Sequence, residues 1–199
     1  MYQFIETICY EQGSFQRLEL HTQRCNKTRY HFFGNQPAIR LETILSIPEH
    51  LKDHTVKCTV TYGVDILNIE YSVYVIKSVK SLQIVTDNVV DYSFKFADRT
   101  QLTSLFDKKG QYDDILIIKD GLITDTSYAN IIYLSNNRWY SQQYPLLLGT
   151  RLQYYIALNL VTPTRLTFND LSNFSEARII NAMISLEKSP IIPIGSIHL

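Results

Sequence analysis

The chain has 199 residues, which is long enough for one large or two small domains. Its formal net charge is zero, so its composition does not indicate binding to nucleic acid or to an anionic membrane. No apolar run reaches the ~18 residues of a membrane helix, and the N-terminus lacks the segments of a secretion signal. Cys9, Cys25 and Cys58 have no C-x-x-C spacing, which favours reduced thiols, a cytoplasmic protein and no metal site.

The first half of the chain is predicted to mix strands with helices. Glycine and proline end the helical stretches, and Val, Ile, Thr and Tyr enrich the strand-like ones. Strands are expected at 2–10, in a return through Phe15 and Arg17, and across 55–86 with a break near Gly63; helices are expected at 20–33, ended by Gly34, and at about 40–46.

The second half follows a linker-like stretch from Asp87 to Ser93 and is predicted to segregate its helices from its strands. Helices are expected at 98–108, capped by Asp98, at 149–160 and at 170–174; strands are expected at 114–119, 129–134, 177–183 and 190–195. This arrangement predicts an α+β fold, with a small N-terminal α+β domain over 1–86 and a larger C-terminal domain over 87–199.

Lys95 and Asp125 carry the chemistry that the sequence suggests. A lysine amine forms an imine with an aldehyde, and a carboxylate keeps a ring nitrogen protonated, so the two could serve opposite ends of pyridoxal 5′-phosphate. Phe94 and Phe96 flank the lysine and are expected to desolvate it partly, which lowers the pKa of its amine toward the nucleophilic range.

Six short motifs follow one another along nearly the whole chain: Phe4-Ile-Glu-Thr7, His21-x-x-Arg24, Lys95-x-x-x-Arg99, Gly121-x-x-x-Asp-x-Ser-x-x-Asn130, Leu148-Gly149-Thr150 and Asn181-Ala182-Met183. In this order they resemble the class IV aminotransferases, also called fold-type IV pyridoxal-phosphate enzymes. The resemblance implies the two-lobed architecture of D-amino-acid aminotransferase, the cofactor pyridoxal 5′-phosphate, a small-molecule amino substrate and a homodimer.

The resemblance also implies a role for each matching residue. Lys95 would form the Schiff base, Asp125 would pair with the pyridine nitrogen, and the phosphate would be contacted by Arg24, Leu148, Gly149, Thr150, Asn181 and Ala182. Arg99 is expected to hold the loop that carries Lys95. Several of these residues also have a simpler structural interpretation. Arg24 could be a solvated arginine on a helix. Asp125 could cap a turn, Thr150 the start of a helix and Asn181 a loop.

Two features depart from the family pattern. Asp125 stands where the family usually has glutamate, so its contact is one methylene shorter and could weaken or pass through water. The chain also begins almost at the Phe4-Ile-Glu-Thr7 motif, so we expect a trimmed small domain that lacks the usual N-terminal segment.

The shared motifs leave the reaction open. A lyase that converts 4-amino-4-deoxychorismate to 4-aminobenzoate and pyruvate, a step of folate biosynthesis, is favoured because Asn181-Ala-Met resembles the Asn-Ala-Leu of that branch. The alternative is an aminotransferase for branched-chain or D-amino acids, in which Lys95 would move the same kind of proton. A non-catalytic pyridoxal-phosphate-binding protein is the third reading, motivated by Asp125 and the short N-terminus.

Overall fold

The computed structural model describes residues 2–199, and its chain forms two compact units. The first unit runs to Ile76 and includes Phe94–Asp98; the second comprises Lys77–Ser93 and Arg99–Leu199. The division differs from the boundary expected after residue 86, because β5 pairs in parallel with β6 and so belongs to the second unit. Together the units confirm the expected α+β class.

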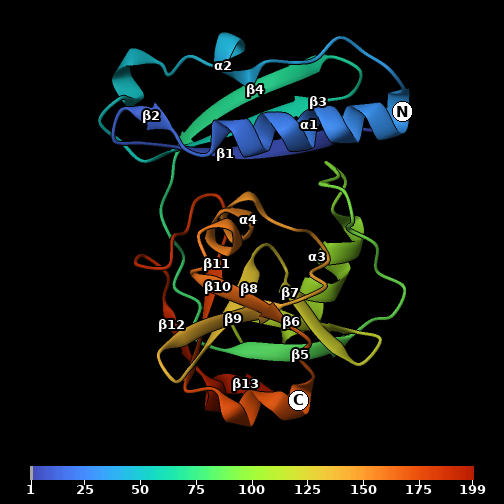
Figure 1. The fold of residues 1–199 in the computed structure, drawn as a ribbon, viewed down its shortest axis with the longest axis vertical. Helices are drawn as coiled ribbons and strands as arrows, with labels where there is room; N and C mark the ends of the chain where they lie inside the picture. Colours follow the sequence, from blue (N-terminus) through green and yellow to red (C-terminus); the bar gives the residue numbers. More distant parts are fainter. Residues whose placement is uncertain (1) are drawn as a thin grey trace. The chain divides into compact units, whose positions relative to one another are not determined.

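The first unit is a four-stranded antiparallel sheet in the order β2-β1-β3-β4, with α1 packed along it (Figure 1). Its elements are β1 Phe4–Glu11, β2 Ser14–Phe15, α1 Leu18–Phe33, α2 Leu41–Ile44, the 3-10 turn η1 Glu49–Leu51, β3 Val56–Tyr62 and β4 Ile66–Val73. Strand β3 buries every second side chain, as a sheet with one covered face requires.

Helix α1 has an unusual inner face, because its buried side chains are His21, Cys25, Thr28 and Arg29 rather than large apolar residues. Their spacing places them on one side of the helix. A polar inner face is stable only when the facing strand supplies partners, and β1 supplies the buried acid Glu6. The helix ends where Gly34 adopts a positive φ, as the sequence predicts.

The second unit is built on a nine-stranded mixed sheet whose main path is β10-β9-β8-β7-β6-β5-β13, with β11 paired to β8 and to β12. Its strands are β5 Leu82–Thr86, β6 Asp114–Lys119, β7 Leu122–Thr126, β8 Asn130–Ser135, β9 Arg138–Gln142, β10 Val161–Thr164, β11 Glu176–Ile180, β12 Ile191–Pro193 and β13 Ile197–His198. Its helices are α3 Thr100–Phe106, η2 Asp107–Lys109, α4 Thr150–Ala157, η3 Phe168–Asn173 and η4 Ile194–Ser196.

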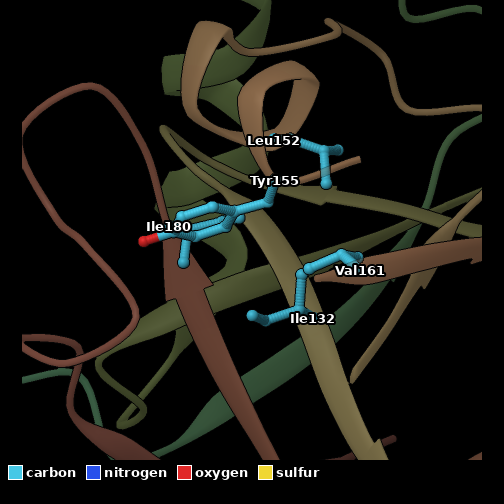
Figure 2. Packing of buried hydrophobic residues seen from close by; sticks show 5 residues of the cluster. All are labelled: Ile132, Leu152, Tyr155, Val161 and Ile180. Atoms are coloured by element: carbon cyan, nitrogen blue, oxygen red, sulfur yellow. The ribbon is translucent and has the colours of Figure 1, made fainter. Parts of the chain in front are cut away.

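Helix α4 is anchored to the sheet by an apolar cluster (Figure 2). Leu152 and Tyr155 of the helix pack against side chains of three strands, namely Ile132 of β8, Val161 of β10 and Ile180 of β11. Leu152 and Tyr155 lie about one turn apart, so one face of this short helix is buried. The cluster therefore fixes where the first turn of α4 lies relative to β8.

Several sequence expectations need correction. Strands β7, β9, β10 and β13 were not expected, and η3 replaces the short helix expected at 170–174. Arg99 rather than Asp98 occupies the N-cap position of α3. Lys95 lies outside the named strands, and its neighbour Phe96 forms an isolated bridge to Phe4. Within residues 2–199, no helix is both long enough and apolar enough to cross a bilayer.

Candidate active site

The residues singled out from the sequence fall in both units. Arg24 and Lys95 lie in the first unit, whereas Asp125, the Leu148–Thr150 motif and the Asn181–Ala182 pair lie in the second. Each group is described within its own unit.

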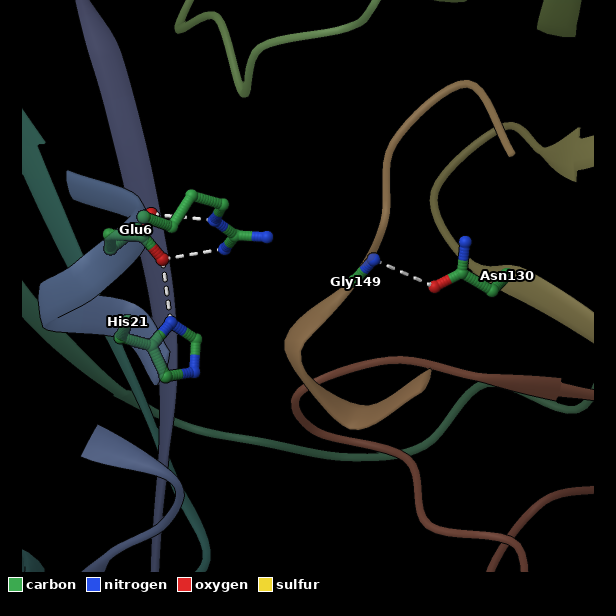
Figure 3. A network of polar contacts seen from close by, with 5 residues as sticks. Glu6, His21, Asn130 and Gly149 are labelled. Carbon is green, nitrogen blue, oxygen red and sulfur yellow. Dashed lines mark hydrogen bonds and ion pairs between the residues drawn. The ribbon is translucent and has the colours of Figure 1, made fainter. Parts of the chain in front are cut away.

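In the first unit, Glu6 of β1 is fully buried and binds two residues of α1 (Figure 3). Arg24 forms a two-pronged contact, with Nε donating to Glu6 Oε1 at 2.8 Å and Nη2 donating to Oε2 at 2.6 Å. His21 Nδ1 lies 2.6 Å from Glu6 Oε2. This geometry orients the guanidinium of Arg24 and explains why α1 carries polar residues on its inner face.

The charges of this cluster follow from burial and pairing. Burial alone would raise the pKa of Glu6, but the charge and hydrogen bonds of Arg24, together with His21, lower that pKa to about 2. Burial lowers the pKa of His21 despite its bond to Glu6. His21 is therefore neutral, and its Nδ1–H donates to the Glu6 carboxylate, so its role is that of a structural partner.

Replacing Glu6 by glutamine should destabilise the protein by roughly 3 kcal/mol at neutral pH, because the buried Arg24 contact loses its countercharge. The folded pKa is depressed, so the stabilisation is present above pH 4.5 and is lost as the pH falls toward 2. Urea denaturation of wild type and Glu6→Gln at pH 7 and at pH 3.5 should show a gap that narrows on acidification. A gap of the same size at both pH values would contradict the prediction.

Lys95 lies at the tip of a tight turn in the first unit. Phe96 N–H donates to Phe94 O at 2.9 Å across it, and Lys95 O accepts from Ile5 N–H at 2.9 Å, which ties the turn to β1. Phe94 and Phe96 both pack on the aromatic cluster around Phe4. The two phenylalanines thus anchor the backbone on either side of the half-buried lysine.

In the second unit, Asp125 lies on β7, just after a hairpin turn. Asp120 and Gly121 both have positive φ between the paired residues Lys119 and Leu122, which is the two-residue turn that Asp-Gly favours. Because side chains alternate along a strand, this turn fixes the face on which Asp125 lies. Its carboxylate is 6% exposed.

Three neutral donors hold the Asp125 carboxylate. Asn130 Nδ2 and Gln142 Nε2 donate to Oδ1 at 2.7 and 2.6 Å, and Leu147 N–H donates to Oδ2 at 3.0 Å. Among residues 2–199, no cationic side chain forms an ion pair with it. Burial without a countercharge raises the pKa of Asp125 to about 7, against the lowering effect of these three hydrogen bonds.

Asn130 connects the acid to the loop before α4 (Figure 3). Besides Asp125, its Nδ2 donates to Leu147 O at 2.9 Å, while its Oδ1 accepts from Gly149 N–H at 3.2 Å. A Cβ on Gly149 would lie 2.4 Å from Asn130 Oδ1, so only glycine fits there. The Leu148-Gly149-Thr150 motif is thereby fixed to the Asp125 hairpin, with Gly149 at the N-cap of α4.

Replacing Gly149 by alanine should therefore destabilise the second unit by roughly 1–3 kcal/mol, because the new methyl group must displace Asn130 or the loop. Thermal unfolding checks the change in stability. Gly195→Ala is the matched control, since a Cβ there meets nothing within 4 Å. Equal melting temperatures for the two variants would show that the Asn130 contact is unimportant.

Arg151 joins the start of α4 to the late loop. Its Nε donates to Asn181 O at 2.9 Å and its Nη2 donates to Ala182 O at 3.0 Å. The Asn181 side chain accepts from the backbone N–H groups of Met183 and Ile184, so it caps its own loop. Gly149, Thr150 and the Asn181–Ala182 backbone are consequently parts of one connected framework.

Four residues with central contacts were not among the predicted site residues: Glu6 in the first unit, and Asn130, Gln142 and Arg151 in the second. Glu6 and Asn130 stand inside the quoted motifs, and an acid among the apolar residues of β1 is a signal of a buried partner. Gln142 and Arg151 carry no comparable signal. Arg99, expected to hold the Lys95 loop, lies in the second unit and donates from Nη2 to Ser127 O at 2.6 Å.

The chain is similar to a known protein family and to another protein. Residues 93–197 match the family model described as amino-transferase class IV. An uncharacterised protein of Haemophilus influenzae is 32% identical over 188 residues, which cover 94% of this chain and 100% of that protein.

Solved structures are similar as well. A candidate 4-amino-4-deoxychorismate lyase of Haemophilus somnus has a TM-score of 0.85 and 31% identity, covering 92% of this chain and 97% of its own. A hypothetical aminotransferase of Mycobacterium tuberculosis, in its pyridoxal-phosphate-bound form, has a TM-score of 0.75 and 13% identity, covering 96% of this chain and 80% of its own. The second similarity concerns the fold alone.

Proposed function

The chain belongs to the class IV aminotransferase family of pyridoxal-phosphate-dependent enzymes, and on that premise we propose that it is a lyase that converts 4-amino-4-deoxychorismate to 4-aminobenzoate and pyruvate. The similarity to the candidate lyase of Haemophilus somnus, which extends over 92% of this chain at 31% identity, is the observation that carries the proposal. Asn181-Ala-Met, which resembles the Asn-Ala-Leu of that branch, adds to it.

Asp125 fits a protonated pyridine nitrogen. A buried carboxylate with three neutral donors and a pKa raised to about 7 lacks a countercharge, and a cationic ring nitrogen would supply one. The hydrogen bonds of Asn130, Gln142 and Leu147 fix both oxygens, so the carboxylate is held in place before a ring nitrogen binds. We therefore assign Asp125 the role of holding the ring in its protonated form.

Within the second unit the start of α4 suits a phosphate group, and the family resemblance assigns Arg24 of the first unit to the same group. Gly149 has no side chain and precedes Thr150 at the N-terminus of α4, where N–H groups and a hydroxyl favour an anion. Leu148 has an exposed side chain, so its backbone is the part available for such a contact. Arg24, oriented by Glu6, would supply the fixed cation, and the Asn181–Ala182 loop further backbone groups.

Lys95 would hold the cofactor through its amine and then serve as the acid and base of the reaction. Bound pyridoxal 5′-phosphate supplies an electron sink for the substrate carbon that loses a proton. Lys95 would take that proton from the carbon bearing the amino group, and the C–O bond between the neighbouring ring carbon and the enolpyruvyl group would break with its electron pair leaving on oxygen. A proton would then be added to the methylene carbon of the released enolpyruvate. The substrate thus divides into 4-aminobenzoate and pyruvate without water or an oxidant.

The assay incubates purified holoenzyme with 4-amino-4-deoxychorismate and no keto acid. Pyruvate and 4-aminobenzoate should appear in equal amounts, and the cofactor absorbance should return to its starting spectrum after turnover. An enzyme that instead takes nitrogen from branched-chain or D-amino acids, and releases no pyruvate from aminodeoxychorismate, is an aminotransferase and contradicts the proposal.

We further propose a homodimer that works in the cytoplasm in folate biosynthesis. Cys9, Cys25 and Cys58 are buried and form no disulfide within residues 2–199, as is common in a reducing compartment. On α4 the side chains of Tyr154 and Leu158 are 41% and 50% exposed one turn apart, an apolar strip suited to a subunit contact. Light scattering of the purified enzyme tests the dimer, and a monomer with full activity contradicts it.

A further inference from the structure

A cavity of about 410 Å³ lies within the second unit, apart from the carboxylate of Asp125 and the start of α4. Its walls come from four places in the chain: residues 77–79, helix α3 with the residue before it, Asp113, and the Ser127–Tyr128 turn that follows β7. The volume is within the range of pockets that hold small organic molecules. None of the residues assigned above to the cofactor lines it.

Two cations that form no ion pair among residues 2–199 line this cavity. Arg99 makes one side-chain hydrogen bond, from Nη2 to Ser127 O, and its buried Nε has no hydrogen-bond partner among residues 2–199. Lys77 is exposed and forms no ion pair within the described part of the chain. A guanidinium and an ammonium at one cavity favour an anion, and the guanidinium favours a carboxylate in particular.

Asp113 also lines the cavity and offsets only one of the two positive charges. Asp113 Oδ2 accepts hydrogen bonds from the backbone N–H groups of Lys80 and Ser81, at 2.8 and 3.1 Å, and from Ser81 Oγ at 3.2 Å. These bonds lower the pKa of Asp113 and keep it ionised. A second negative charge on a ligand would therefore be disfavoured, which selects a monocarboxylate over a dicarboxylate.

The rest of the wall combines apolar side chains with residues that carry hydroxyl groups, namely Ser78, Thr103, Ser127 and Tyr128. Val79 and Leu102 are each 4% exposed, and the ring of Phe106 also faces the cavity. Apolar side chains with a few placed charges are the usual make-up of a site for a small amphiphilic ligand. A flat hydrocarbon body of the size of one benzene ring fits both the wall and the volume.

We propose that this cavity binds a small aromatic monocarboxylate, with Lys77 and Arg99 holding the carboxylate and Val79, Leu102 and Phe106 covering the ring. The site is separate from the cofactor residues but connected to them, because Arg99 is bonded to Ser127, two residues from Asp125. Binding there would restrain the Ser127–Tyr128 turn, which directly follows the strand that carries Asp125. The proposal does not depend on which reaction the enzyme catalyses.

Isothermal titration of the holoenzyme with sodium benzoate, at constant ionic strength, tests the site. Benzoate should bind saturably, and the neutral isostere benzamide at least about tenfold more weakly, since it lacks the charge. Lys77→Met should weaken benzoate binding about fivefold, and Lys77→Arg should retain it. Lys77 is exposed, so both variants should fold.

Lys80→Met is the matched control, because Lys80 is also exposed, lies three residues away and does not line the cavity. It should bind benzoate as the wild type does. Absence of saturable binding, equal affinity for benzamide, or a benzoate affinity that Lys77→Met leaves unchanged would each overturn the proposal. Binding that persists in Lys77→Met would place benzoate elsewhere, for example at the cofactor.

Discussion

Lys95→Ala should abolish both the covalent attachment of the cofactor and the catalysed reaction. The amine is the group we propose to hold the cofactor aldehyde and to carry the proton, and a positioned acid–base group alone is worth roughly 10²–10⁴-fold in rate. Borohydride reduction of the wild type followed by peptide mass spectrometry should identify one modified lysine, Lys95. The variant should yield no modified peptide and no product above background.

Lys77→Ala and Lys80→Ala are the controls for this experiment, since both residues are exposed lysines of the second unit. Each should keep the reduced adduct and at least most of the activity. Because Phe94 and Phe96 anchor the turn from within the aromatic cluster, alanine at position 95 should also leave the melting temperature nearly unchanged. An adduct at Lys77 or Lys80, or full turnover in Lys95→Ala, would remove the assignment.

Where a local signal dominated, the sequence predicted the elements well. Helix α1 ends at Gly34 with a positive φ, and β6 turns at Asp120-Gly121, both because glycine is favoured in those conformations. Strand β10 was missed because Pro163 argues against a strand, although β10 lies at the edge of the sheet, where proline is tolerated. Strand β9 was missed although Asn136-Asn137, both with positive φ, form the turn before it.

The candidate site could be predicted only in part, because sequence motifs identify residues but not their partners. The sequence predicts Asp125 as the acid that pairs with the ring nitrogen. It does not predict the hydrogen-bond donors to this carboxylate, which come from β8, β9 and the loop before α4. Contacts between segments so far apart in the chain leave no periodic pattern to read. The necessity of Gly149 likewise became visible only with the position of Asn130.

Asp125→Asn should flatten the pH dependence of stability in the cofactor-free protein. The folded protein holds the Asp125 proton up to a pKa of about 7, whereas the unfolded chain releases it near 3.8. The native state therefore binds more protons between these values, so the free energy of unfolding falls as the pH rises through this window and is constant above it. This difference between the folded and unfolded pKa of Asp125 corresponds to a change of roughly 4 kcal/mol in the free energy of unfolding across the window.

Urea denaturation of both proteins at pH 5 and pH 8 measures this effect. Asparagine also sets its amide against the Leu147 N–H, which costs about 1–3 kcal/mol at either pH and cancels in the comparison. The wild type should lose more stability between pH 5 and pH 8 than Asp125→Asn does. Asp170→Asn is the control, because a hydrogen bond from Thr167 lowers the pKa of Asp170, so this change should not flatten the profile.

The same substitution should reduce the turnover of the loaded enzyme by roughly 10²-fold or more, because a neutral amide cannot stabilise a protonated ring nitrogen. Asp125→Glu keeps the charge and should retain more activity than Asp125→Asn. If Asp125 only capped a turn, its replacement would leave turnover unchanged. We instead expect Asp125→Asn both to reduce the loss of stability of the cofactor-free protein at high pH and to lower the turnover of the loaded enzyme. Parallel stability profiles for wild type and Asp125→Asn, or unimpaired turnover, would show that Asp125 does not serve the cofactor.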